Sequence, residues 1–215
     1  MNNYKLTVEY DGSSFYGWQK QKKFRNTIQE CIEESLSKLL KEKISIIGAG
    51  RTDAGVHAYN QIANFRIDSK IERYDKLLYS LNSMLPSAIT IKSIRKVKED
   101  FHARYSAKKR EYIYKITTKN ISIGRNYFYK LNYELDFKVI DEFIKILTGY
   151  NSFKSLCKNS EDKHGFCCTL LNLNYKINKS KGTIVLRILA DRFLHSMVRA
   201  TIGALIDLGR GKIGL

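Results

Sequence analysis

The sequence predicts an α+β fold built from two similar halves. Apolar residues alternate with polar ones in several segments, which is typical of half-buried strands, and recur at helical spacing in others. In the first half the order of these segments is strand, helix, strand, strand, helix, strand, and the second half begins the same order again. The single proline, Pro86, falls at the end of a predicted helix, so it interrupts no predicted element.

The first half has the element order of a split βαβ unit, the ferredoxin-like pattern. Its first strand, residues 4–10, alternates with a period of two and stops at Asp11-Gly12. Its first helix begins with a capping box, in which Thr27 is followed by Glu30. The remaining elements are predicted strands at 44–47, 60–67 and 89–94 and a helix at 74–85.

The second half repeats five of these six elements. Strands are predicted at 111–116, 170–177 and 183–189, and helices at 136–149 and 193–208. A final strand is expected after the last helix, but the chain stops at Leu215, so the last strand is predicted to be missing. We therefore expect an N-terminal half at 1–105 and a C-terminally incomplete half at 106–215. Their strands are expected to share one mostly antiparallel sheet with the helices on one face.

The chain is strongly basic. It has 38 Lys and Arg against 21 Asp and Glu, a formal net charge of +17, and the cations are spread along its length. Such a charge indicates a polyanionic partner, of which nucleic acid is the commonest. The alternative is a solubilising surface in a lysine-rich composition. With 43% hydrophobic residues the chain can still bury a substantial core.

The N-terminus lacks the apolar segment of a secretion signal, and no stretch approaches the roughly 18 apolar residues of a membrane helix. The sequence therefore predicts a soluble cytoplasmic protein with no membrane partner. The four cysteines are not arranged as paired C-x-x-C units, and His164 with Cys167 supply too few ligands for zinc. We expect free thiols in a reducing compartment and no metal site.

The residues best suited to take part in a reaction lie between the predicted strands at 44–47 and 60–67. This stretch, residues 48–58, has three glycines around Arg51 and Asp53 and ends near His57. Its glycines match a dinucleotide fingerprint only in the first two positions, and a strand follows where that motif needs a helix. A hairpin-like loop that presents Asp53 to a ligand fits better. The alternative is a glycine-rich hairpin in which the aspartate only caps a turn.

The last predicted helix carries a second candidate group. His195, Arg199 and Gly203 recur every four residues and form a polar and small stripe beside an apolar row. Arg199 is therefore interpreted as an interior cation that seeks a carboxylate, for which Asp53 is the attractive candidate. The alternatives are an exposed arginine at the helix edge or one that pairs with Asp191.

Two segments mix aromatic residues with cations, as RNA-binding loops do, because bases stack on rings and lysines contact phosphate. The first is residues 15–23, whose alternative role is to anchor the loop to the core through Phe15 and Trp18. The second is residues 101–112, which joins the halves and is alternatively a basic linker into a strand.

In order and spacing these motifs resemble the TruA-type tRNA pseudouridine synthases over nearly the whole chain. Residues 50–58, Gly-Arg-Thr-Asp-Ala-Gly-Val-His-Ala, are the most specific of them. The others are Tyr10-Asp11-Gly12, Gly17-Trp18-Gln19 with Gln21, Phe101-His102-Ala103-Arg104, Arg110-Glu111-Tyr112-Ile113-Tyr114, Phe193-Leu194 with Met197-Val198-Arg199, and Gly209-Arg210-Gly211-Lys212.

The resemblance implies an isomerase that converts uridine to pseudouridine in tRNA, at positions 38, 39 and 40 of the anticodon arm. It also implies that no cofactor is needed and that a homodimer binds the tRNA across both subunits. The family normally continues past Gly-Arg-Gly-Lys into a short helical stretch and a closing strand, which this sequence lacks. We therefore expect weak activity or weak tRNA affinity from the 215-residue chain.

The resemblance also assigns roles to individual residues. Asp53 corresponds to the catalytic nucleophile, Arg51 to the arginine associated with base flipping, Tyr112 to the tyrosine that packs on the target base, and Arg199 to the arginine that pairs with the catalytic carboxylate. The expected substrate-binding residues are Tyr112, Arg51, Phe101, His102, Arg104, Tyr105, Lys158 and Asn159. Two alternatives keep the scaffold: a tRNA-binding protein with weakened or lost chemistry, and a synthase that acts on a different RNA.

Overall fold

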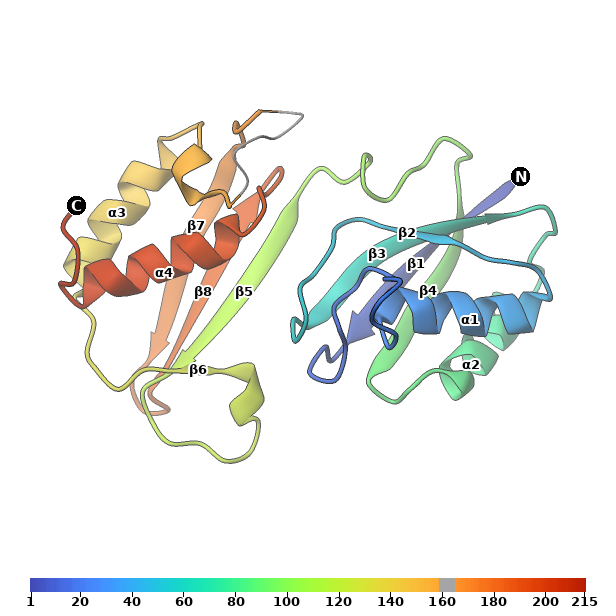
Figure 1. The fold of residues 1–215 in the computed structure, drawn as a ribbon, viewed down its shortest axis with the longest axis horizontal. Coiled ribbons are helices and arrows are strands. Elements are labelled where there is room, and N and C mark those ends of the chain that lie inside the picture. Colours follow the sequence, from blue (N-terminus) through green and yellow to red (C-terminus); the bar gives the residue numbers. More distant parts are fainter. Residues whose placement is uncertain (159–164) are drawn as a thin grey trace. The chain divides into compact units, whose positions relative to one another are not determined.

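A computed structural model describes residues 1–158 and 165–215 of the chain. The described residues form two compact units, Met1–Ala107 and Lys108–Leu215. Each unit has its own four-stranded sheet with two helices (Figure 1). The α+β class, the mostly antiparallel pairing and the ferredoxin-like order of the halves are confirmed.

Unit 1 contains all six elements that the sequence predicts. The strand order is β2-β3-β1-β4, and every neighbouring pair is antiparallel. This order places β1 between β3 and β4, as in a ferredoxin-like fold. The elements are β1 (Asn2–Tyr10), α1 (Ile28–Leu40), β2 (Ile46–Gly48), β3 (Ala58–Ile67), α2 (Tyr74–Met84) and β4 (Ile89–Val97).

Alternation along β1 separates the two faces of the unit 1 sheet. Tyr4, Leu6, Val8 and Tyr10 are buried and join the same core as residues of α1 and α2. Both helices therefore cover one face of the sheet (Figure 1). The intervening residues of β1, including Lys5, point to the opposite face, because successive side chains of a strand alternate. We call the side of the sheet opposite α1 and α2 the open face of unit 1.

The start of α1 explains how the chain enters the helical layer. The Thr27 side chain accepts a hydrogen bond from the backbone N–H of Glu30, at 3.3 Å. The Glu30 carboxylate in turn accepts one from the backbone N–H of Asn26, at 3.2 Å. The predicted capping box is present, with its returning bond shifted by one residue toward the N-terminus.

Unit 2 has the sheet order β6-β5-β8-β7. β5 pairs antiparallel with β8 along its whole length and parallel with the very short β6. The helices pack on the apolar core that also contains the inner residues of β7 and β8. The elements are β5 (Arg110–Thr117), β6 (Tyr129–Lys130), α3 (Phe137–Thr148), β7 (Leu170–Asn178), β8 (Thr183–Ala190) and α4 (Met197–Gly209), with short 3-10 turns at Arg125–Tyr127 and Lys154–Leu156.

Three details differ from the sequence prediction. The structure has one sheet in each unit in place of a single shared sheet, because the strand order of each sheet is complete within its own unit. β6 was not predicted, since two residues are too short for a recognisable alternation. The last helix begins at Met197 and not at 193, because Ser196 has the left-handed φ of 64°. His195 therefore precedes the helix, and the expected stripe of His195, Arg199 and Gly203 on one helix is wrong.

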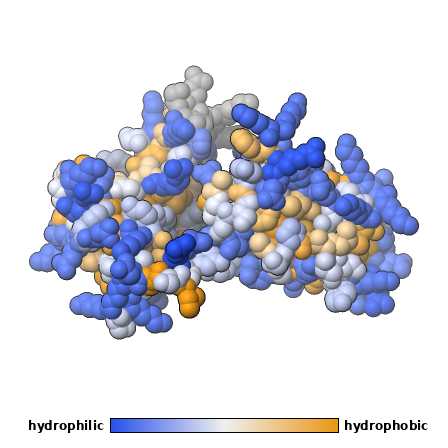
Figure 2. All heavy atoms as spheres, turned by 60° about the horizontal axis from the view of Figure 1, so that its bottom comes forward, coloured by the Kyte–Doolittle hydropathy of each residue, from blue (hydrophilic) through white to orange (hydrophobic). Residues whose placement is uncertain are grey.

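The surface combines hydrophilic and hydrophobic residues. Hydrophilic residues cover most of the face that Figure 2 shows, with hydrophobic atoms visible between them. Among the described residues, no helix is both long and apolar enough to cross a membrane.

Candidate active site

The loop that carries Asp53 connects β2 to β3, and two hydrogen bonds to β3 anchor the end that follows β2. The Ala49 N–H donates to the carbonyl of Ile62 at 2.7 Å, and the Gln61 side-chain amide donates to the carbonyl of Gly50 at 2.6 Å. The tip is closed by a bond from the Val56 N–H to the Asp53 carbonyl at 3.2 Å. Asp53 and Arg51 are both exposed on this fixed hairpin-like loop.

A second loop, between β1 and α1, supports the Asp53 loop from the side of the core. The Trp18 side chain is 1% exposed, and its backbone N–H donates to the Thr52 carbonyl at 3.0 Å. The hydroxyl groups of Tyr10 and Thr52 are hydrogen-bonded at 2.8 Å. Thr52 is thus held through its backbone and its side chain, which fixes the residue immediately before Asp53.

Two glycines allow this close packing. Gly17 has a φ of 85°, and a Cβ there would lie 2.6 Å from the Thr52 carbonyl oxygen. A Cβ on Gly48 would lie 2.5 Å from the Trp18 indole nitrogen. A side chain at position 17 would displace the Asp53 loop, and one at position 48 would displace the Trp18 ring, so the glycines keep the two loops in contact.

His57 connects the end of the Asp53 loop to the end of β1. The backbone N–H of Gly12 donates to His57 Nδ1 at 3.1 Å, and the Asp11 carboxylate lies 3.0 Å from the same nitrogen. In the neutral imidazole Nδ1 accepts the bond from Gly12, and in the protonated ring it forms an ion pair with Asp11. In both protonation states the ring holds the loop against β1.

The predicted RNA-facing loop at 15–23 has two parts with different roles. Phe15 and Trp18 are buried, so the alternative that they anchor the loop is confirmed. Tyr16 and Phe24 are exposed and stack on each other, with ring centroids 4.9 Å apart. Lys23 lies 5.6 Å above the Phe24 ring. Phe24 was missed from the sequence, because it lies just outside the aromatic run that marks the motif.

In unit 2, Tyr112 lies in the middle of β5 and is half-buried. Its ring meets Phe193 edge to face, with centroids 5.0 Å apart, so the segment before α4 fixes the orientation of the tyrosine. Phe193 belongs to a quoted motif, but the sequence assigned it no role. Its contact with Tyr112 comes from the pairing of β5 with β8, which brings residue 112 opposite residue 188.

Arg199 lies in the first turn of α4 and is exposed, so the expectation of an interior cation is wrong for this structure. It is close enough to Tyr114 to act on its hydroxyl electrostatically. Burial raises the pKa of Tyr114, the neighbouring Tyr129 raises it further, and the Arg199 cation opposes both effects. A cation at a helix N-terminus is opposed by the helix dipole, by roughly 0.3–1 kcal/mol.

The segment after β4 carries an exposed cluster of two rings and a guanidinium. His102 and Tyr105 have ring centroids 4.4 Å apart, and the Arg104 guanidinium lies 5.8 Å from the Tyr105 ring. The turn is closed by bonds between His102 and Ser106 in both directions, at 2.8 and 3.1 Å. Tyr105 is 72% exposed, and its ring is available for stacking.

The remaining predicted site residues are less informative. The Lys158 N–H donates to the His195 carbonyl at 3.0 Å, which ties its loop to the residues before α4. Asn159 lies outside the described residues. Asp53 belongs to unit 1 and Arg199 to unit 2, so their pairing stays a prediction.

All four cysteines are free, and within residues 1–158 and 165–215 no group of three potential ligands could hold a metal ion.

Comparison with known proteins identifies the family of the chain. The profile of the tRNA pseudouridine synthase family matches residues 6–106 and 143–215. The tRNA pseudouridine synthase A of Pelodictyon phaeoclathratiforme is 41% identical over 215 residues, covering 100% of this chain and 87% of that protein. The tRNA pseudouridine synthase A 2 of Bacillus cereus strain ZK / E33L is 39% identical and covers 99% and 86%.

A solved structure, an unknown protein from Galdieria sulphuraria, aligns with 98% of the chain and 93% of its own. Its sequence identity is 14% and its TM-score is 0.28, which is too low to bear on the fold. The two curated relatives match the chain over nearly its whole length, and the family profile covers both units. The chain belongs to the tRNA pseudouridine synthase family.

Proposed function

We propose that this protein isomerises uridine to pseudouridine at positions 38, 39 and 40 of the tRNA anticodon stem-loop, with Asp53 as the nucleophile. One observation carries the proposal: in a chain of the tRNA pseudouridine synthase family, an exposed carboxylate lies at the tip of a loop fixed from three sides. A fixed, exposed carboxylate next to Arg51 suits attack on a substrate that carries a phosphate backbone.

The reaction breaks the bond between the ribose and N1 of the base and forms one between the ribose and C5. The proton on C5 leaves, and N1 gains a proton, so the product is an isomer of the substrate. Asp53 assists by attacking the ribose or the base, or by taking a proton from the sugar. The target base must leave its stack to reach the carboxylate.

The other predicted residues supply orientation. Arg51, beside Asp53 on the loop, has a planar cation that can fill the space of the flipped base. Tyr112, whose ring orientation is set by Phe193, packs on the target base and exchanges the proton at C5. Arg199 pairs with the catalytic carboxylate and keeps it ionised. Its position against the helix dipole is consistent with an anionic partner.

Binding of the tRNA uses the segment from Phe101 to Tyr105 together with Lys158 and Asn159. The stack of His102, Tyr105 and Arg104 offers a surface for an unpaired base. The net charge of +17 supports affinity for the phosphates. The protein acts as a homodimer in the cytoplasm and needs no cofactor.

The substrate assignment is tested by mapping pseudouridine with a carbodiimide and primer extension. tRNA transcripts with uridine at 38, 39 or 40 are incubated with the protein, and matched transcripts carry cytidine at these positions. New stops only at the three uridines are expected. Binding without stops would identify a tRNA-binding protein, and stops confined to another RNA in a total RNA sample would identify a synthase with a different substrate. Either result would contradict the proposal.

A further inference from the structure

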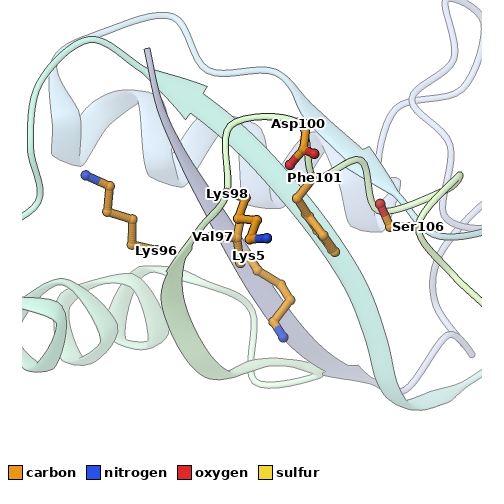
Figure 3. Close-up of a pocket in the computed structure, with 7 residues that line it drawn as sticks. All are labelled: Lys5, Lys96, Val97, Lys98, Asp100, Phe101 and Ser106. Carbon is orange, nitrogen blue, oxygen red and sulfur yellow. The ribbon is translucent and has the colours of Figure 1, made fainter.

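The open face of unit 1 contains a hollow that the proposed chemistry does not use. Its volume is about 770 Å³, and it lies where β1, β4 and the segment after β4 meet. In Figure 3 the side chains of Lys5 and Lys98 and the ring of Phe101 point into the same space, while the Lys96 amine extends away from them. The hollow is lined by Lys5, Lys96, Val97, Lys98, Asp100, Phe101 and Ser106.

The charge of this hollow is positive and uncompensated. Its lining includes three lysines and a single acidic residue, Asp100. In the described part of the chain, Lys5, Lys96 and Lys98 form no ion pair and no side-chain hydrogen bond, although Lys5 is half-buried. A cluster of cations without internal ion pairs attracts an anionic ligand. An anionic ligand would supply the missing contact.

Two buried asparagines of the sheet fix the shape of the hollow. Asn3 and Asn64 are 1% and 0% exposed. The Asn3 amide donates to the carbonyls of Phe101 and Lys98 at 2.8 and 3.0 Å, and the Asn64 amide donates to the Asn3 side-chain oxygen at 3.0 Å. The Ala103 N–H donates to the Asn64 side chain at 2.9 Å. This network holds the segment that carries Lys98 and Phe101 against the sheet.

The position of the hollow indicates the size of its ligand. Lys5 lies five positions before Tyr10 on β1, and Tyr10 contacts the residue next to Asp53. At the usual rise per residue this is roughly 17 Å along the strand. A single nucleotide bound at Asp53 cannot also fill the hollow, whereas a polynucleotide can occupy both.

We propose that this hollow binds the RNA backbone, with phosphate at Lys5 and Lys98 and a neighbouring base against the Phe101 ring. The inference rests on the proposed function, because it assigns a second contact for the same RNA substrate. The mixture of ammonium groups and an aromatic ring matches the two parts of a nucleotide that carry no sequence information. The hollow therefore contributes affinity for RNA and leaves the chemical step unchanged.

The test compares two charge-matched double variants in RNA-binding titrations at several salt concentrations. Lys5→Gln/Lys98→Gln removes two cations of the hollow, and Lys179→Gln/Lys181→Gln removes two exposed cations from the turn between β7 and β8. The hollow variant should bind tRNA severalfold more weakly, and the slope of log K against log salt should fall by about 1.4, or about 0.7 for each phosphate contact. The turn variant should retain the wild-type slope.

A substitution of Asp100 should change the affinity for RNA in the opposite direction. Asp100→Asn keeps the size of the side chain and removes the carboxylate, so binding of an anion should become tighter. In turnover assays the hollow variant should raise KM for tRNA and leave kcat at saturating tRNA unchanged. Lys98→Arg keeps the charge and should retain wild-type affinity.

Equal slopes for both double variants, or no tightening in Asp100→Asn, would overturn the proposal. A changed molar mass in light scattering, with RNA binding intact, would assign the hollow to a contact between copies of the chain and would also overturn it. Failure of the proposed function would give a different result, because the wild type would then bind RNA without isomerising it.

Discussion

Both units contain a strand, a helix, two strands and a helix in ferredoxin-like order, but they differ in how their first strand is paired. In unit 1, β1 pairs with β4 over eight residues, from Asn3↔Val97 to Tyr10↔Ile89. In unit 2, β5 occupies the equivalent place, and β6 pairs with only two of its residues, Ile116 and Thr117. On the other side β5 has a full ladder with β8.

This difference separates the roles of the units. Unit 1 is a complete scaffold, and the Asp53 loop is fixed on it by contacts with β1 and the loop before α1. Unit 2 holds the strand of Tyr112 mainly through β8 and through side chains such as Phe193. We therefore expect the geometry around Asp53 to depend on backbone and glycine packing, and that around Tyr112 to depend on side-chain packing.

The largest expected effect comes from a cavity in either core. Leu6→Ala in β1 and Ile188→Ala in β8 each remove a buried side chain, and each should lower the free energy of unfolding by about 2–5 kcal/mol. The cores are separate clusters, so Leu6→Ala should raise hydrogen exchange in β1 and β3 and leave β7 and β8 protected. Equal loss of protection in both units would contradict the separation of the two cores.

A smaller effect is expected from the asparagine network of unit 1. Asn64→Ala leaves the Asn3 side-chain oxygen without its donor and the Ala103 N–H without its acceptor, which should cost about 1–3 kcal/mol in chemical denaturation. The matched variant is Asn172→Ala, an exposed position of β7, for which we expect a change within about 0.5 kcal/mol. If the two variants were equally stable, the network would not hold the segment after β4.

The helix caps allow a direct comparison of the units. Thr27 caps α1, and Asp136 caps α3 by accepting from the Lys138 N–H at 2.9 Å. Replacing either by alanine should cost about 1 kcal/mol. The carboxylate also interacts favourably with the helix dipole, so Asp136→Ala should be the more damaging of the two at low salt. A larger loss in Thr27→Ala under these conditions would contradict this ranking.

The last expected effect appears only at high pH and concerns the buried thiol of unit 2. Burial, with a further contribution from Asp191, raises the pKa of Cys168 from 9.0 to about 11. Between these values the folded state keeps a proton that the unfolded state releases, so the stabilisation is complete below pH 9 and is lost as pH rises toward 11. The stability of Cys168→Ala should therefore fall less steeply over this range in pH-dependent denaturation. Identical slopes would mean that the thiol is not shielded.

Much of this fold could be predicted from the sequence because its signals are local. The alternation of residues 4–10 and the Thr27 capping box correspond to β1 and α1. The start of α4 could not be predicted, because the apolar spacing continues through His195 while the backbone turns left-handed at Ser196. β6 could not be predicted either, because it is held by two residue pairs with β5 and lacks any periodic signal.

The candidate site divides in the same way. The residues around Asp53 form a contiguous motif, so the sequence alone identifies the loop and its aspartate. The contacts that fix this loop come from Tyr10 and Trp18, and the contact that orients Tyr112 comes from Phe193. Such contacts depend on how strands pair over long separations, which spacing along the chain does not encode. The Asn3–Asn64 network was missed for the same reason.

The central claim, that Asp53 is the nucleophile for uridine isomerisation, is tested most directly by tritium release from tRNA labelled at uridine C5. Asp53→Asn keeps the size of the side chain, and Asp68→Asn, at an exposed position after β3, is the matched control. We expect release from the wild type and from Asp68→Asn, and none from Asp53→Asn although it still binds tRNA. Wild-type release from Asp53→Asn would contradict the account and place the nucleophile elsewhere.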